Sequence, residues 1–227
     1  TVVTAMQQMF YSLSIAMGIL ITFGSYMKKN VSIEESTDQV EIFDTLIAFL
    51  AGLMIIPAVF AFSGADAGKN LDAGPSLMFI TMPKTFASFP GGRAFGLLFF
   101  MLVLFAALTS SIALMESAVS TLEDELGWSR KKATIVIGAI MLGLGTLSAL
   151  GYGVLANVKI IGMQFLDFFD FITNSVMMPL AAIATCLLVS KVIGLDKIDE
   201  EVTLGGAKFV RKKIFHFMIK WLCPLFC

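Results

Sequence analysis

Long apolar stretches, separated by shorter charged ones, run along the whole chain. A helix needs about 20 apolar residues to cross a hydrocarbon core about 30 Å thick. Five stretches reach that length, over residues 2–27, 42–62, 94–122, 133–154 and 168–193, and another begins near Ile214. The pattern therefore predicts five complete transmembrane helices and the start of a sixth.

The composition is that of a lipid-facing protein. Of the 227 residues, 57% are hydrophobic and 15% charged, whereas a soluble domain has about 25% charged residues. The net charge of −1 provides no basic field for nucleic acid. The three cysteines and the one histidine, His216, give neither a zinc-ligand pattern nor a disulfide framework, and no nucleophile–base pair can be assembled. We expect an integral membrane protein that is not an enzyme and uses no organic cofactor.

Basic residues fall mostly in alternate connections between the apolar stretches. Eleven lie on one side and four on the other, the four being Lys69, Lys84, Arg93 and Lys159. Because cytoplasmic connections carry the excess of Lys and Arg, the N-terminal end of the chain is predicted to lie on the outer side of the cell membrane. An outside start and the lack of an initial Met lead us to expect a piece of a longer protein.

The chain divides into three predicted parts. Residues 1–193 form the five-helix core, 194–213 a cytoplasmic connection, and 214–227 the start of the next transmembrane helix. The outer connection 63–93 is too long for a simple turn, and its Pro and Gly residues separate short apolar pieces. It is predicted to form one or two short helices that fold over the outer surface as a lid, with a solvated loop as the alternative.

Small residues interrupt the first apolar stretch. Ser12, Ser14, Ala16 and Gly18 lie halfway along it, and Gly and Ser weaken helices relative to Ala and Leu. Such a segment can unwind in the membrane and free backbone carbonyls for a cation or an amine. The alternative is a small-residue face that permits close helix packing.

Three hydroxyl residues follow one another at bilayer depth in the third stretch. A Thr or Ser hydroxyl in a helix usually bonds the carbonyl three or four residues back, which brings the Ala106 carbonyl beside the hydroxyls of Thr109 and Ser110. These oxygens could form part of a shell for a monovalent cation. The alternative is back-bonded hydroxyls without an ion.

Acidic residues also occur inside or beside the apolar stretches. Asp44 lies two residues into the second stretch with no basic residue near it, so its carboxylate needs a cation or stays protonated. The alternative is a position at the cytoplasmic start of the helix, where an acid suits the helix dipole and water is close. Asp167 and Asp170 share one helix face near the outer end of the fifth stretch, and Asn174 extends that face. They are either gate residues or interfacial acids.

Taken in order, these segments resemble the neurotransmitter:sodium symporter family, the sodium-coupled amino-acid and amine transporters with the LeuT fold. The resemblance rests on QQMFYSLSIAMGILITFGSY, IIPAVFAFSG, SLMFITMPKTF and FAALTSSIALMESAVSTLEDELGWSRKKA. It covers essentially the whole chain, from the sixth transmembrane helix to the start of the eleventh. It implies an all-α integral membrane fold, the second of two inverted five-helix repeats, and first five helices that lie outside this chain.

The resemblance also implies roles for individual residues. The substrate would be held by Tyr11, Ser12, Ser14, Met17, Ser110 and Leu114. One sodium ion would bind Ser12 and Asp44, and a second would bind Ala106, Thr109 and Ser110. The outer gate would use Gln8 and Asp170, and the cytoplasmic gate Tyr26 and Asp124.

Three positions depart from the family's common residues. Ala16 stands where Gly is common, Met17 where an aromatic residue is common, and Asp44 where Asn is common. In chloride-dependent relatives an anion near the sodium site offsets the charge of the cations, and other members carry a carboxylate one helical turn beyond the position of Asp44. Here that next-turn residue is Ala48, so Asp44 itself is expected to supply the negative charge.

The implied function is sodium-coupled symport of an amino acid by alternating access. Met17 and Leu114 are uncharged, and Met is adaptable, so a hydrophobic or aromatic amino acid is expected. Half of each site would come from the first five helices, so this piece alone is expected to be inactive. The alternative is a structural or regulatory membrane subunit with no transport cycle, in which the polar clusters serve only packing.

Overall fold

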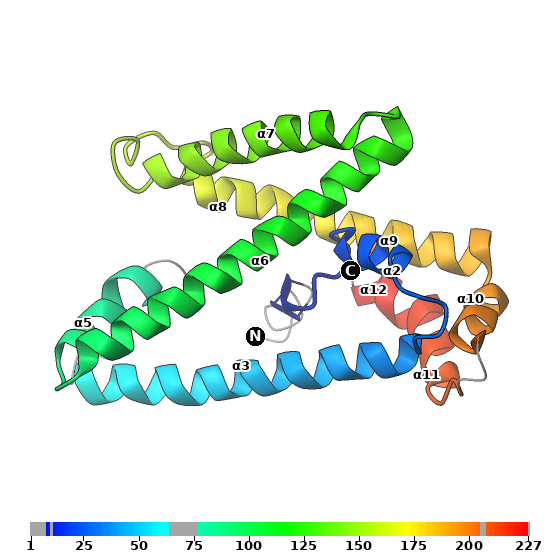
Figure 1. Ribbon diagram of the computed structural model, residues 1–227, viewed down its shortest axis with the longest axis horizontal. Helices are drawn as coiled ribbons and strands as arrows, with labels where there is room; N and C mark the ends of the chain where they lie inside the picture. The colour runs from blue at the N-terminus through cyan, green and yellow to red at the C-terminus, as the bar shows by residue number, and fades with distance from the viewer. Residues whose placement is uncertain (1–7, 10, 64–76, 205–207, 227) are drawn as a thin grey trace. The chain divides into compact units, whose positions relative to one another are not determined.

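The computed structural model describes residues 8–9, 11–63, 77–204 and 208–226. The regular structure of these residues is helical, with one isolated β-bridge between Ile160 and Met163. The elements, with π-helical segments written η, follow one another along the chain as shown in Figure 1: α2 Ile19–Ser25, α3 Ile33–Ser63, η2 Leu77–Thr81, α5 Met82–Ala87, α6 Gly92–Leu126, α7 Arg130–Leu150, α8 Phe165–Asp170, η3 Phe171–Met177, α9 Met178–Leu187, η4 Leu188–Ile193, α10 Leu195–Val202, α11 Lys212–Phe217, η6 Met218–Leu222 and α12 Cys223–Phe226.

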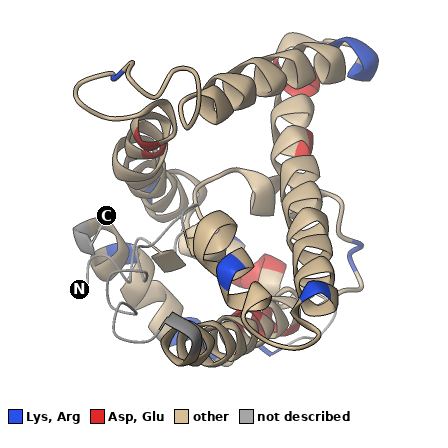
Figure 2. Cartoon of the chain, turned by 90° about the vertical axis from the view of Figure 1, so that its left-hand side faces the viewer, with Lys and Arg blue, Asp and Glu red and all other residues tan. Residues whose placement is uncertain are grey.

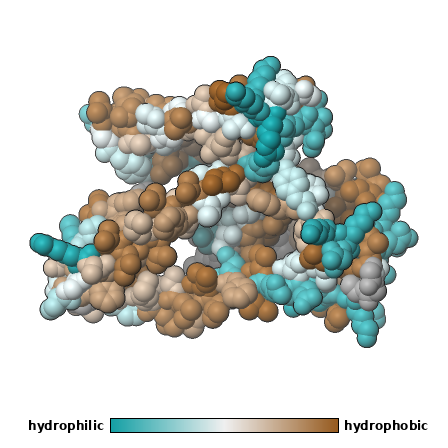
Figure 3. All heavy atoms as spheres, in the orientation of Figure 1, coloured by the Kyte–Doolittle hydropathy of each residue, from teal (hydrophilic) through white to brown (hydrophobic). Residues whose placement is uncertain are grey.

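Four helical runs in the described part of the chain are long and apolar enough to cross a membrane. They are Ile33–Ala61, Gly92–Leu126, Arg130–Leu150 and Phe165–Ile193, and each overlaps one of the predicted spans. Their most apolar windows have mean hydropathy between 2.0 and 2.5, with at most 17% of any window buried. Few charged residues interrupt these helices (Figure 2), and apolar side chains cover much of the visible surface (Figure 3). A surface this apolar is stable in contact with lipid and not with water.

The second span begins earlier than its apolar pattern indicates. α3 starts at Ile33 rather than near residue 42, because a capping sequence precedes the apolar stretch. The Ser32 hydroxyl accepts the backbone N–H of Glu35 at 3.3 Å, and Glu34 and Glu35 place negative charge in the first turn. Hydropathy marks where a helix can contact lipid, whereas the cap marks where it begins.

The chain packs as two compact units. The first combines residues up to Val40 with those from Ala113 onward. Within it, α7 contacts α8 and α9 contacts α12 (Figure 1). Val119 of α6 and Ala133 of α7 are among its fully buried positions. The second unit is residues Glu41–Ile112.

Aromatic rings hold the short helix α5 of the second unit. The ring centroids of Phe86 and Phe99 lie 5.4 Å apart, and those of Phe79 and Phe100 lie 6.1 Å apart, so η2 and α5 pack on the start of α6. A Cβ at Gly92 would lie 1.6 Å from the Phe86 carbonyl oxygen, so only glycine permits this approach. These helices lie inside the connection 63–93; its residues 64–76 are outside the described part, and the lid role stays a prediction, as do the three part boundaries.

The last complete span is helical throughout but not uniform. α8, η3, α9 and η4 follow one another from Phe165 to Ile193 without a break. Pro179 lies inside this continuous run, two residues after the π segment Phe171–Met177, and supplies no backbone N–H to the helix. The two π segments, Phe171–Met177 and Leu188–Ile193, have hydrogen bonds that span five residues instead of four.

Candidate functional site

The first predicted span is broken in its middle. Tyr11 and Ser12 are helical, Leu13–Gly18 are not, and α2 begins at Ile19. Ser14, Ala16 and Gly18 have φ values of 54°, 62° and 77°. Residues with side chains rarely adopt this left-handed region, so two of the three positions are strained. The predicted break is present. The Leu13 N–H still donates to the Met9 carbonyl at 3.0 Å, the Ser14 N–H donates to the Tyr11 carbonyl only three residues back at 3.1 Å, and the four-residue pattern resumes at Thr22, whose N–H donates to the Gly18 carbonyl at 3.0 Å.

The segment from Gly18 onward, at the start of α2, packs closely on α6. A Cβ at Gly18 would lie 2.8 Å from the Ser117 hydroxyl oxygen. The Thr22 hydroxyl lies 3.5 Å from the same oxygen, and Thr22 and Ser117 are only 7% and 8% exposed. The sequence left unwinding and close packing as alternatives. The structure shows both, with the break before Gly18 and the close contact from Gly18 onward.

The hydroxyl patch of α6 has the local geometry that helix back-bonding predicts. The Thr109 hydroxyl donates to the carbonyls of Phe105 and Ala106, at 3.1 and 3.0 Å. The Ser111 hydroxyl donates to the Ala107 carbonyl at 2.7 Å. Ser110 differs, since its hydroxyl forms no hydrogen bond within the described residues. The Ala106 carbonyl and the Thr109 hydroxyl are therefore neighbours, and both keep lone pairs for a cation.

The remaining predicted ligands lie on different elements. Ser12 is exposed at the edge of the break, and Met17 is half-buried within it. Asp44 is half-buried on α3, and Leu114 lies on α6 with 44% of its surface exposed. Ser12 and Asp44 belong to different packing units, so the sodium site that they would share stays a prediction.

A charged network that the sequence did not predict ties α2, α6 and α7 together. The Tyr26 hydroxyl donates to Glu116 Oε1 at 2.8 Å. Arg130 forms ion pairs with Glu116 at 2.6 Å and with Glu123 at 3.2 Å. The resemblance matched Tyr26 with Asp124 as gate residues; in the structure Tyr26 contacts Glu116, while Asp124 is exposed.

A signal for this network was present in the sequence. Glu116 is a carboxylate inside the predicted span 94–122, and an acid at that depth needs a partner. Arg130 follows after a short connection that folds α7 back, and such a return brings it alongside the preceding helix. The spacing of 14 residues between them was the reason that the pair was missed.

Removing the Glu116 charge is expected to destabilise the protein. In Glu116→Gln the amide can still accept from Tyr26, but the Arg130 guanidinium loses its shorter ion pair. We expect the melting temperature of the detergent-purified protein to fall by ~2–4 °C. Glu125→Gln, an equal charge change at an exposed position of the same helix, is the control. Equal melting temperatures for the two variants would show that the network adds no stability.

Asp167 and Asp170, the acids predicted near the outer end of the fifth span, lie on α8, and η3 follows directly. The Asn174 amide donates to Asp170 Oδ1, and the Thr173 hydroxyl donates to the Phe169 carbonyl at 2.8 Å. Burial, and secondly the Asp167 carboxylate, raise the pKa of Tyr152 above its ordinary value. Gln8, the other predicted gate residue, is exposed. The outer gate pair stays a prediction.

In the described part of the chain, four helices are long and apolar enough to cross a membrane and a further apolar helix is broken at mid-length, which defines an integral membrane protein. The chain belongs to the sodium:neurotransmitter symporter family, whose model matches residues 2–227.

Known relatives agree with this assignment. The chain is 30% identical to the sodium-dependent transporter YhdH of Bacillus subtilis (99% of this chain, 49% of YhdH). It is 32% identical to a sodium-dependent transporter of Haemophilus influenzae (96% of this chain, 46% of that protein). The chain thus spans about half the length of these relatives.

A solved structure supports the fold. The crystal structure of MhsT in complex with L-phenylalanine superposes with a TM-score of 0.86 at 36% identity, covering 99% of this chain and 49% of MhsT. The predicted fold class is therefore confirmed. It is an all-α membrane fold of the LeuT type, corresponding to its second inverted repeat and the start of the next helix.

Proposed function

We propose that the chain is the carboxyl-terminal part of a sodium-coupled amino-acid symporter that works by alternating access. The observation that carries the proposal is the break at Leu13–Gly18 in an otherwise apolar helix. Irregular backbone at membrane depth is tolerated only where it lines a cavity or is buried in protein. Family membership and the sodium-dependent relatives support sodium as the coupled ion.

The substrate is a hydrophobic or aromatic amino acid. Carbonyls around Tyr11, Ser12 and Ser14 hold its amine, while Met17 and Leu114 shape the side-chain pocket, with Ser110 beside it. None of these side chains carries a charge that would select an acidic or basic substrate. MhsT, which resembles this chain over nearly its whole length, is solved with L-phenylalanine, and this supports the substrate class.

Two sodium ions are co-transported with the amino acid. One binds Ser12 and Asp44, and the other binds Ala106, Thr109 and Ser110. The membrane potential contributes about 2.3 kcal/mol per charge per 100 mV, so two ions supply roughly 4.6 kcal/mol, or somewhat over a thousandfold accumulation. Gln8 and Asp170 close the outer side, and Tyr26 and Asp124 the cytoplasmic side. Tyr26 also bonds Glu116, which pairs with Arg130.

Uptake by the full-length protein in proteoliposomes tests the proposal. We expect labelled phenylalanine or leucine to accumulate only with an inward sodium gradient, and bulky apolar amino acids to compete. Displacement of the label only by acidic, basic or very small amino acids would contradict the substrate class. Absence of sodium-driven uptake and binding would favour the non-transporting subunit. The 227-residue piece alone is expected to be inactive.

Ser110→Ala is expected to weaken the dependence on sodium. The substitution deletes one cation oxygen, so the half-saturating sodium concentration should rise roughly tenfold, which corresponds to about 1.4 kcal/mol. Ser111→Ala is the matched control, because the Ser111 hydroxyl already donates to the Ala107 carbonyl. If both variants keep the original sodium dependence, the assignment of the second sodium site is wrong.

A further inference from the structure

The helical run of α11, η6 and α12 returns along the end of the last complete span. η6 contacts η4 and α12 contacts α9, so the two helices run antiparallel. Met218–Leu222 therefore lies at the level of Leu188–Ile193, where the span ends, and α11 lies beyond that end. Residues at this level meet lipid headgroups rather than the hydrocarbon core.

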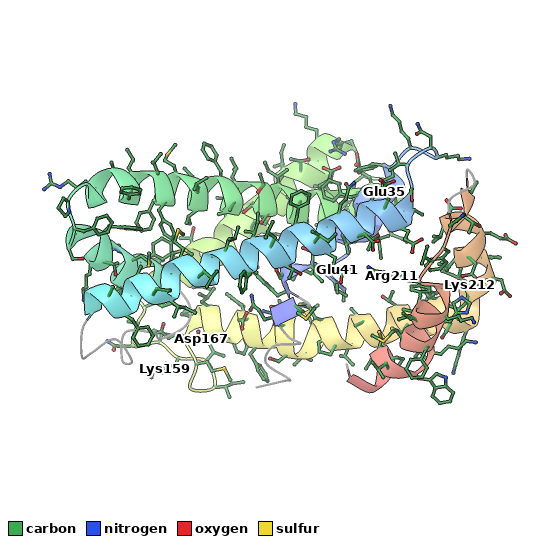
Figure 4. The ribbon with its side chains drawn as sticks, turned by 90° about the horizontal axis from the view of Figure 1, so that it is seen from below. Glu35, Glu41, Lys159, Asp167, Arg211 and Lys212 are labelled. Carbon is green, nitrogen blue, oxygen red and sulfur yellow. The ribbon has the colours of Figure 1, made fainter. Side chains whose placement is uncertain are left out.

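One face of α11 is attached to its neighbour α10 and has its charge compensated there. The Lys212 ammonium lies 2.8 Å from Asp199, and His216 Nε2 lies 2.9 Å from the same carboxylate. Figure 4 shows Lys212 at the base of α11, beside α10. The hydrogen bond from Lys212 is the main cause that lowers the pKa of Asp199 below its ordinary value. Asp199 therefore stays ionised at neutral pH and balances the charge of Lys212.

The adjoining face of the same helix carries cations that have no acidic partner. Lys213 and Phe217 follow Lys212 and His216 by one residue each, and Lys220 follows Phe217 by three, so Lys213, Phe217 and Lys220 share a face. All three are exposed. Neither lysine forms an ion pair within the part of the chain that the structure describes. The positive charge of this face is therefore available to a partner.

An aromatic ring and a third cation lie at the same level. Trp221 directly follows Lys220 and is 70% exposed. Tryptophan is enriched where membrane meets water, because its ring is apolar and its N–H can reach headgroup oxygens. Lys191, in the last turn of η4, is exposed and also lacks an ion pair among the described residues. Because η4 contacts η6, two neighbouring helices bring cations to one depth.

We propose that Lys191, Lys213 and Lys220, with Phe217 and Trp221, bind the headgroup of an anionic lipid on the side that the charge pattern predicts to be cytoplasmic. Lysine ammonium groups bind phosphate as point charges, and basic residues at this end of a transmembrane helix attract anionic lipids. The two aromatic rings contact the first part of the acyl chains, which a free anion lacks. The exposed acids of α10 belong to the connection beyond the end of the span, whereas η4 and η6 lie at that end itself.

Lipid binding by the full-length protein tests the site. The protein is purified in detergent, mixed with phosphatidylglycerol and phosphatidylcholine, and the bound lipids are counted by native mass spectrometry. We expect a preference for phosphatidylglycerol, and we expect Lys213→Gln and Lys220→Gln each to weaken its binding about fivefold, which corresponds to about 1 kcal/mol for one basic residue. Lys213→Arg and Lys220→Arg keep the charge and should keep the binding. Lys197→Gln, an equal charge change at an exposed position of α10, is the control.

Three other outcomes would each overturn the proposal. Displacement of the lipid by excess inorganic phosphate would show a site for a free anion. Equal weakening in Lys197→Gln would show a general charge effect of the whole connection. No preference for phosphatidylglycerol over phosphatidylcholine would show that another part of the protein, or a second protein, covers this face. None of these measurements uses transport, so the result does not depend on the proposed function.

Discussion

Replacing Asp44 by Asn in the full-length protein is expected to raise the half-saturating sodium concentration by roughly ten- to a hundredfold, or to make uptake depend on added chloride. The carboxylate is proposed to lie beside sodium, and an opposite charge within about 4–6 Å strongly favours the charged species. At 4 Å the attraction is about 4 kcal/mol in a medium of effective dielectric constant 20. Ala48, one turn further along α3, offers no replacement charge.

Anion substitution provides the measurement. Uptake by the unmodified protein should be equal in chloride and in gluconate, while Asp44→Asn should recover only in chloride. Glu35→Gln, an acid-to-amide change on the same helix away from the proposed site, controls for charge alone. Loss of uptake by the unmodified protein in gluconate would show that Asp44 is not the compensating charge.

Replacing Gly18 by Ala is expected to reduce uptake at least tenfold. Gly18 has a φ of +77°, a conformation that costs an L-residue about 1–2 kcal/mol. The new Cβ would also lie 2.8 Å from the Ser117 hydroxyl oxygen. Ser117 must then rotate away from Thr22, which breaks the hydrogen bond between these two buried hydroxyls.

A second substitution separates the backbone strain at position 18 from the steric overlap with Ser117. In Gly18→Ala with Ser117→Ala the overlapping oxygen is gone, so uptake should recover in part, and only the backbone strain should remain. Gly24→Ala is the control, because a Cβ at Gly24 of the same helix would meet nothing within 4 Å. A Gly18→Ala variant as active as Gly24→Ala would show that the junction tolerates a side chain.

The spans were predictable because nearly every residue that faces lipid must be apolar, so a transmembrane helix is visible in the sequence as a long apolar stretch. Hydropathy located the four continuous spans, but placed the start of the second near residue 42, because the cap formed by Ser32 with Glu35 lies in polar sequence. The break at Leu13–Gly18 was also predictable, since Ser and Gly are weak helix formers at a depth where other residues are apolar.

The network of Tyr26, Glu116 and Arg130 and the hydrogen bonds from the residues before α11 to Glu34 were not predictable in the same way. Each joins residues far apart in the chain, and nothing in the spacing of Glu34 and Arg211 reveals that α3 and α11 meet. A carboxylate inside an apolar stretch, such as Glu116, indicates that a partner is needed but not which residue it is. Only the folded structure identifies Tyr26 and Arg130 as the partners of Glu116.

The two wide turns of the Phe165–Ile193 run, its π segments Phe171–Met177 and Leu188–Ile193, bear on which single-residue deletions this helix can accommodate. A π turn holds one residue more than an α turn, so it can gain or lose that residue without rotating the regular segments that flank it. Between the wide turns, Met178, Ala182 and Cys186 form a buried stripe with four-residue spacing, 7%, 6% and 7% exposed. A deletion inside α9 would turn Cys186 by about 100° away from Met178, whereas the same deletion in Phe171–Met177 would leave that stripe facing the same neighbours.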